Sequence, residues 1–89
     1  MVVLLIQHTV KDYAAWKKVF DSVSDMRKSS GEISAEVYHD AGDPNKLTVF
    51  NKWDSMANAQ KFVQSPDLRA AMEKAGVVGQ PSISFLNEE

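Results

Sequence analysis

The chain has 89 residues, no cysteine, 44% apolar residues and a formal net charge of -2 at pH 7. This length predicts a single domain over residues 1–89, and the absence of cysteine excludes disulfides and thiolate sites. The slightly negative charge supplies no basic field for a phosphate backbone, so we expect no nucleic-acid partner.

The first predicted element is a strand from Val2 to Thr9, because valine, leucine and isoleucine follow one another up to Ile6. A continuous apolar run, rather than an alternating one, predicts a strand that is covered on both faces. The run is too short to span a membrane, and it lacks the basic residues and cleavage site of a signal peptide. We therefore expect no membrane partner and, by default, a cytoplasmic protein.

A helix is predicted to follow, with Asp12 as its cap and Gly31 at its end. Apolar residues recur in it at helical spacing. They are Tyr13, Trp16, Val19, Phe20 and Val23. Its basic residues, which include Arg27 and Lys28, are predicted to form a solvated face.

An antiparallel hairpin comes next. Ile33, Ala35 and Val37 alternate with polar residues, which indicates a half-buried strand. The segment Asp40–Asn45 contains glycine and proline and predicts the turn. The returning strand is predicted over Leu47–Trp53.

The second helical region is predicted to begin at a cap formed by Asp54 or Ser55 and to end at Gly76. The step Ser65-Pro66 is predicted to interrupt it, because proline cannot continue a helix and favours the start of a new one.

The remaining residues predict a turn at Gly79 and Pro81, a short strand over Ser82–Leu86 and a frayed tail over Asn87–Glu89. The predicted order is βαββαβ, an α+β, ferredoxin-like arrangement in which an antiparallel sheet carries two helices on one face. The other face of such a sheet would expose more apolar surface than a monomer tolerates, which predicts a homodimer.

Four segments carry a resemblance to a known group of proteins. They are HTVKDYAAWKKVFD (His8–Asp21), FNKWD (Phe50–Asp54), SPDL (Ser65–Leu68) and KAGVVG (Lys74–Gly79). These segments resemble the dimeric α/β-barrel superfamily and, within it, the antibiotic-biosynthesis-monooxygenase-like domains. The resemblance implies two sheets packed face to face as a dimeric α/β barrel. It also implies similarity to monooxygenases that need no cofactor and act on aromatic or polyphenolic small molecules.

The chain departs from this group in its second helical region. Several catalytic relatives carry a histidine a few residues before the Ser-Pro step, where this chain has Phe62 and Val63. The Asn-Trp-His set of the haem-degrading relatives is also incomplete, because Asn51 and Trp53 share one strand and no histidine follows in the helix. We therefore do not expect haem degradation.

His8 is the candidate catalytic base, because imidazole titrates near neutral pH and a base is needed to form the substrate anion that reacts with oxygen. The alternative is a histidine at the surface or at the end of a strand that makes one structural hydrogen bond. The other histidine, His39, is expected in solvent, and the pair lacks metal-ligand spacing, so we predict no metal site.

The candidate substrate-binding residues are Tyr38, Asn51, Trp53, Phe50 and Glu36. Asn51 and Trp53 share one parity of the third strand, Phe50 has the other, and Tyr38 shares a parity with Glu36. One parity faces the helices and the other faces the dimer interior, and the pattern does not decide which. Apolar walls with a few polar anchors would suit a flat aromatic ligand, whereas the alternative makes the aromatic residues core and the polar residues rim.

Two hypotheses follow. The first is a cofactor-independent monooxygenase with an aromatic-lined pocket. The second is a non-catalytic dimeric barrel that binds a small hydrophobic ligand or has a structural or stress-related role. A connected pocket with His8 in its wall favours the first, and an interior filled by side chains favours the second.

Overall fold

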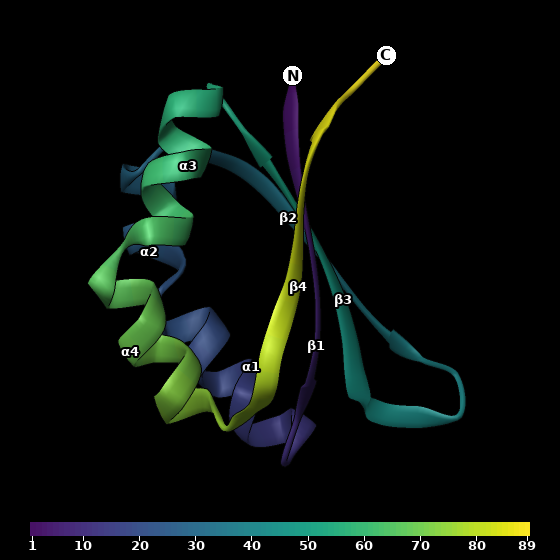
Figure 1. The fold of residues 1–89 in the computed structure, drawn as a ribbon. Helices are drawn as coiled ribbons and strands as arrows, with labels where there is room; N and C mark the ends of the chain where they lie inside the picture. The colour runs from purple at the N-terminus through teal and green to yellow at the C-terminus, as the bar shows by residue number, and fades with distance from the viewer.

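The computed structural model describes all residues, 1–89, and contains one four-stranded antiparallel sheet in the order β2-β3-β1-β4. Its strands are β1 (Val2–Val10), β2 (Glu32–Asp40), β3 (Asp43–Trp53) and β4 (Val77–Asn87). Its helices are α1 (Tyr13–Ser22), α2 (Ser24–Ser29), α3 (Met56–Gln64) and α4 (Pro66–Ala75). All the helices lie on one side of the sheet (Figure 1), so the predicted ferredoxin-like α+β fold is confirmed.

The predicted helix boundaries rest on local capping. The Asp12 carboxylate caps α1 and the Ser55 hydroxyl caps α3, each accepting a hydrogen bond from the backbone N–H three residues later. Ser65 ends α3 and caps α4, with Pro66 at the first helical position. Gly76 ends α4 in the left-handed conformation, with φ of 79°, which glycine adopts without steric cost.

The first helical region is divided, which the sequence-based prediction missed. α1 ends at Ser22, and Val23 separates it from α2 with φ of -103° and ψ of 14°. The Ser22 hydroxyl donates to the Val19 carbonyl oxygen at 2.7 Å, and such a local bond competes with regular helical hydrogen bonding. The regular helix is therefore interrupted at Val23.

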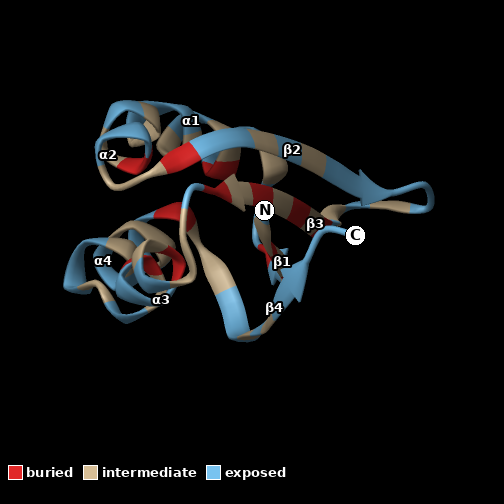
Figure 2. Cartoon of the chain, turned by 90° about the horizontal axis from the view of Figure 1, so that it is seen from above, coloured by how far each residue is buried: buried red, intermediate tan, exposed pale blue.

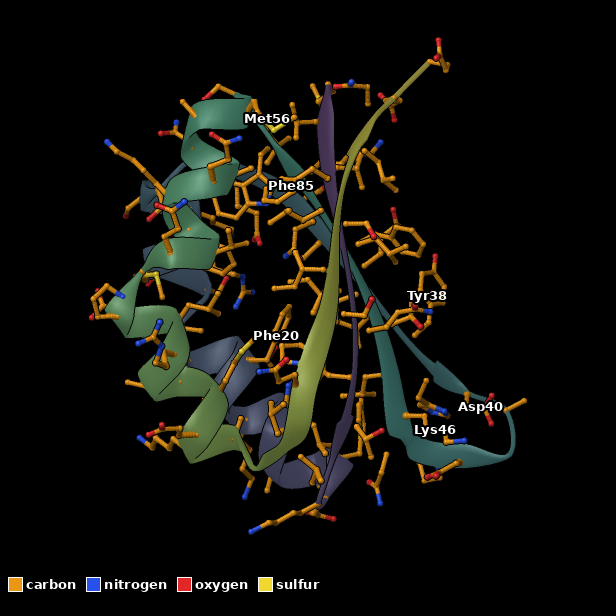
Figure 3. The ribbon with its side chains drawn as sticks, in the orientation of Figure 1. Phe20, Tyr38, Asp40, Lys46, Met56 and Phe85 are labelled. Atoms are coloured by element: carbon orange, nitrogen blue, oxygen red, sulfur yellow. The ribbon has the colours of Figure 1, made fainter.

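The hairpin turn is shorter than predicted. Because β3 begins at Asp43, only Ala41 and Gly42 separate the two strands. The Asp40 carboxylate accepts a hydrogen bond from the Gly42 N–H at 2.9 Å and so closes the turn with its own side chain. Asp40 and Lys46 both lie at the tip that projects away from the helices (Figure 3).

The predicted turn at Gly79 and Pro81 is wrong, because both residues lie within β4. They form an irregularity in the ladder with β1, where the pairing moves from Gln7↔Ser82 to Thr9↔Val78. Gly79 takes a φ of 70° there, and extra residues on one strand are the mark of a β-bulge.

The predicted frayed tail is also wrong in part. Asn87 pairs with Val2 in the sheet. The Glu88 carboxylate lies 2.9 Å from the Lys52 ammonium, and the Glu88 N–H donates to the Met1 carbonyl oxygen at 2.9 Å. The end of the chain therefore continues along the sheet.

The hydrophobic core lies between the sheet and the helices, as the buried residues in Figure 2 indicate. One cluster consists of Ile6, Val10, Trp16, Leu47, Val49 and Ala75. A second consists of Leu4, Trp53, Ala59 and Phe62. None of the four helices combines the length and apolar character needed to cross a bilayer.

The opposite side of the sheet, here called the open face, carries no helix (Figure 1). Along β1, Leu4 and Ile6 are buried under the helices, whereas Val3 and Leu5 point to the open face and are half-buried. Directly opposed residues of an antiparallel pair share a face, so Phe50, which pairs with Leu5, also lies on the open face. Within the single chain, β1 is thus covered on one face only, and cover for the second face stays a prediction.

Candidate functional site in a cavity between the sheet and the helices

A cavity of about 60 Å³ lies between the sheet and the helices, and we call it the interlayer cavity. Twelve of its 15 lining residues are hydrophobic. The polar ones are His8, Arg27 and Asn51. Phe20 points into the same layer in Figure 3. An apolar space with a few polar groups is the usual composition of a small-molecule site.

His8 reaches this cavity because it shares the helix-facing side of β1 with Leu4 and Ile6. Its ring lies beside that of Trp16, with 5.6 Å between centroids. Both ring nitrogens are buried and have no hydrogen-bond partner, so His8 makes no structural hydrogen bond of the kind the alternative reading expected. Burial lowers the pKa of the His8 imidazole below its usual value, because a charged ring loses hydration. At pH 7 the ring is therefore neutral and offers one nitrogen as a proton acceptor.

The lowered pKa of His8 predicts a pH-dependent stability. The unfolded chain binds a proton to this histidine more readily than the folded chain does, so stability falls as the pH drops below the unfolded pKa of about 6.5. We expect His8→Gln to lessen the loss of stability between pH 7.5 and 5.5, measured by urea denaturation. His39→Gln, a change at an exposed histidine, should leave the loss unchanged. An identical pH dependence in the His8→Gln variant would contradict the prediction.

The bulge in β4 lies opposite His8. Gln7 and Thr9 both have partners on β4, whereas His8 pairs only with Leu47 on β3. Bulges occur often beside active sites, where they redirect a side chain or interrupt pairing. The bulge in β4 therefore lies opposite His8, the titratable residue of β1 that lines the cavity.

Asn51 contributes an amide to the same cavity. It lies on the helix-facing side of β3 and is 1% exposed. Its Nδ2 donates to Glu32 Oε2 at 2.7 Å, whereas its Oδ1 is buried without a partner. A buried acceptor without a partner is uncommon, and in a cavity wall it is a place where a ligand or water can donate a hydrogen bond.

Arg27 and Glu32 form a buried ion pair behind Asn51. Arg27 Nε lies 2.9 Å from Glu32 Oε2, and the two residues are 4% and 8% exposed. Arg27 Nη1 donates to the Phe20 carbonyl oxygen at 2.6 Å, and the guanidinium lies 3.8 Å from the centre of the Phe20 ring. Each charge therefore has a partner, as burial requires.

This position of Arg27 corrects the prediction of a solvated basic face. Sequence reasoning also missed Glu32 as a functional candidate. A signal was present, because Trp16, Phe20, Val23 and Arg27 follow one another at intervals of three and four residues. That spacing places Arg27 on the apolar side of the helical region. A charged residue on such a side predicts a buried partner.

The other candidate site residues lie elsewhere. Trp53 faces the helices but is fully buried against Phe62, with 4.8 Å between the rings, and it does not line the cavity. Tyr38, Phe50 and Glu36 lie on the open face, and Figure 3 shows Tyr38 pointing away from the helices. The structure thus brings His8 and Asn51 to one cavity and separates them from the other four.

The three residues on the open face form a cluster of their own. Tyr38 Oη donates to Glu36 Oε2 at 2.6 Å, and the Tyr38 ring meets the Phe50 ring edge-on at 6.0 Å. The hydrogen bond to the Glu36 carboxylate raises the pKa of the Tyr38 phenol. No group of three or more metal-binding side chains gathers in the structure.

The size of the cavity limits what it holds in this conformation. One water molecule needs roughly 10–15 Å³, and an engineered cavity of about 150 Å³ admits benzene. The interlayer cavity, at about 60 Å³, has room for a few water molecules. A ring-sized ligand requires the helical wall to move, and Met26 and Met72 in that wall have the flexible side chains that adapt to such a change.

Comparisons with known proteins agree with this architecture. The family model for antibiotic biosynthesis monooxygenases matches residues 1–74. SnoaB, a cofactor-independent oxygenase from Streptomyces nogalater, superposes with a TM-score of 0.81 at 12% identity, over 99% of this chain and 92% of that one. A conserved protein from Methanosarcina mazei Go1 superposes with a TM-score of 0.78 at 14% identity, over 99% of this chain and 92% of that one. Rv0793 from Mycobacterium tuberculosis superposes with a TM-score of 0.74 at 15% identity, over 99% of this chain and 94% of that one.

At these identities the structural matches establish the shared fold alone. No protein with a curated description matches the chain. The family match covers most of its length, from the first strand into the last helix. The chain therefore belongs to the antibiotic biosynthesis monooxygenase family.

Proposed function

We propose that this protein is a cofactor-independent monooxygenase of hydroxylated aromatic molecules, which bind in the interlayer cavity. One observation carries the proposal: His8 and Asn51 line the same apolar space, and the His8 ring nitrogens and the Asn51 amide oxygen are buried without partners. Family membership supports the reaction class, as does the fold shared with SnoaB, which is described as a cofactor-independent oxygenase.

In this proposal His8 is the catalytic base. The Asn51 oxygen orients the substrate by accepting a hydrogen bond from its hydroxyl on binding, before that O–H turns to His8. His8 removes the phenolic proton, and the resulting anion has electron density on ring carbon that reacts with molecular oxygen. For 1-naphthol, one oxygen atom becomes the second carbonyl of 1,4-naphthoquinone and the other leaves as water. The substrate supplies all the electrons, so no redox cofactor enters the balance.

The proposal predicts oxygen consumption with 1-naphthol as the probe. We expect His8→Ala to lower the rate by about 100-fold or more, because a positioned general base typically contributes a factor of 10²–10⁴. The measurement combines an oxygen electrode with the appearance of 1,4-naphthoquinone. His39→Ala, a change at the exposed histidine, is the matched control and should keep the wild-type rate.

Two results would contradict this assignment. An unchanged rate in the His8→Ala variant would remove His8 from the mechanism. The absence of oxygen consumption by the wild-type protein with 1-naphthol and related polyphenols would instead favour a non-catalytic role.

The second candidate function is a non-catalytic dimeric barrel that binds a small hydrophobic ligand or has a structural or stress-related role. The small volume of the interlayer cavity favours it, because about 60 Å³ is closer to a filled core than to an open pocket. Binding of 1-naphthol without turnover would support this function over the first.

We also propose that residues 1–89 form one domain that assembles as a homodimer through the open face. Leu5 and Phe50 pair at the middle of this face, and Leu86 and Tyr38 are 40% and 52% exposed on it. An apolar patch spread over four strands is typical of a protein interface. Tyr38, Phe50 and Glu36 then contribute to the dimer interior, whereas Trp53 supports the core beside the cavity.

A further inference from the structure

The orientation of the Asn51 amide follows from its neighbour. Glu32 Oε2 accepts two hydrogen bonds, from Arg27 Nε at 2.9 Å and from Asn51 Nδ2 at 2.7 Å. A carboxylate that pairs with a guanidinium accepts hydrogen bonds and has none to donate, and Glu32 pairs in this way with Arg27. The group of Asn51 that faces Glu32 must therefore be the NH2, and the oxygen must face away from the carboxylate.

We propose that Glu32, held by Arg27, is a positioning residue that fixes the Asn51 amide with its oxygen toward the interlayer cavity. The site then selects a ligand that carries a hydrogen-bond donor, such as a neutral phenol, over the corresponding ether or quinone. This inference rests on the proposed function because it assigns the ligand class of the same cavity.

The charges around the cavity support a neutral ligand. Arg27 lines the cavity, but its guanidinium is shared among the Glu32 carboxylate, the Phe20 carbonyl oxygen and the face of the Phe20 ring. The cation is therefore already neutralised and gives little attraction to an anionic ligand. Among the residues that line the cavity, the buried groups without partners are the Asn51 oxygen and the two His8 nitrogens, and Trp53, whose Nε1 also has no partner, does not line it.

Of these groups, the Asn51 oxygen explains why a donor is selected, because a neutral His8 ring has one nitrogen that donates and one that accepts and so favours neither kind of ligand. A buried acceptor that receives no hydrogen bond carries a desolvation cost, which an O–H group removes and a methoxy group does not. With the Asn51 amide fixed, the site cannot rotate it to offer an NH2 group to an ether or a carbonyl oxygen. A freely rotating amide would accept either kind of ligand.

The test compares binding of 1-naphthol with that of 1-methoxynaphthalene, which differs by the loss of the donor. Tryptophan fluorescence reports the binding, because Trp16 lines the cavity. We expect the wild-type protein to bind the naphthol about 10-fold more tightly. In Glu32→Gln, whose amide either donates or accepts, the Asn51 amide is free to rotate, and the preference should fall to about 2-fold or less.

A matched control separates positioning from general destabilisation. Glu73→Gln makes the same chemical change at an exposed position of α4 and should keep the wild-type preference. If Glu32 had a structural role only, Glu32→Gln would weaken both ligands equally and leave their ratio unchanged. That result would overturn the inference, as would equal binding of the two ligands, or binding of neither, by the wild-type protein.

Glu32→Gln leaves the Arg27 charge without its partner, which destabilises the fold of this variant. A second variant without an unpaired charge is therefore needed. The double variant Arg27→Met with Glu32→Gln removes both charges and should show the same loss of preference. Side-chain amide NMR of the wild-type protein gives a third measurement: one Asn51 amide proton should exchange slowly with solvent, and rapid exchange of both would overturn the inference. Oxygen consumption is read separately, so donor-selective binding without turnover refutes only the catalytic proposal.

Discussion

Replacing Arg27 with methionine is expected to lower the free energy of unfolding by about 3–5 kcal/mol, because the buried Glu32 carboxylate loses its cation. The pair has almost no contact with solvent, with side chains that are 5% and 3% exposed, so water does not replace the lost partner. The hydrogen bond to the Phe20 carbonyl oxygen and the contact with its ring are lost as well. Urea denaturation at pH 7 and at one fixed protein concentration measures the change.

Two further variants define the origin of this loss. Arg27→Met combined with Glu32→Gln removes the unpaired charge and should recover most of the stability, because a neutral pair of similar volume replaces the ions. Lys28→Met removes a charge from the adjacent, exposed position of the same helix and should change stability by about 0.5 kcal/mol or less. A loss as small as this in the Arg27→Met single variant would mean that Glu32 is not buried as described.

The order of elements was predictable because its signals are local. Asp12, Ser55 and Ser65 each cap a helix within three residues of their own position, and Gly76 ends the last helix through its own backbone conformation. Such signals depend on a few neighbouring residues, so they can be read without knowledge of the tertiary structure. The βαββαβ order follows from them.

The faces of the sheet were not predictable in the same way. Asn51 is buried under the helices while its neighbour Phe50 faces the open side, which reverses the usual preference of the two residue types. Asn51 is buried because it bonds to Glu32, 19 residues earlier in the chain. The alternation of side chains along a strand shows which residues share a face. Only this long-range partner decides which of the two faces the helices cover.

The site itself depends on further long-range contacts. Of the six site residues predicted from the sequence, His8 and Asn51 line one cavity and the other four do not. The cavity lies between the sheet and the helices, whereas the expected binding space lay on the face that a second copy would cover. The Gly79 irregularity opposite His8 was read as a turn, because glycine and proline punctuate loops and bulges alike.

Replacing Phe50 with glutamate is expected to convert the proposed homodimer to a monomer. Phe50 pairs with Leu5 at the middle of the open face, and the substitution would place one carboxylate from each subunit in the centre of the interface. An unpaired charge in such a place costs several kcal/mol, so we expect the dissociation constant to rise by about 1,000-fold or more. Sedimentation velocity at micromolar concentration measures the change in mass from the dimer toward the 9.9 kDa chain.

The fold of the chain should survive this change, because Phe50 does not belong to either core cluster beneath the helices. Circular dichroism tests that expectation. Ala57→Glu adds the same charge at an exposed position in α3, on the other side of the sheet, and should leave the mass unchanged. A wild-type protein that sediments as a folded monomer would refute the homodimer. Leu5 and Phe50 would then be exposed to water in a folded single chain. Because the interlayer cavity lies on the opposite side of the sheet, the His8 and Asn51 proposal does not depend on this result.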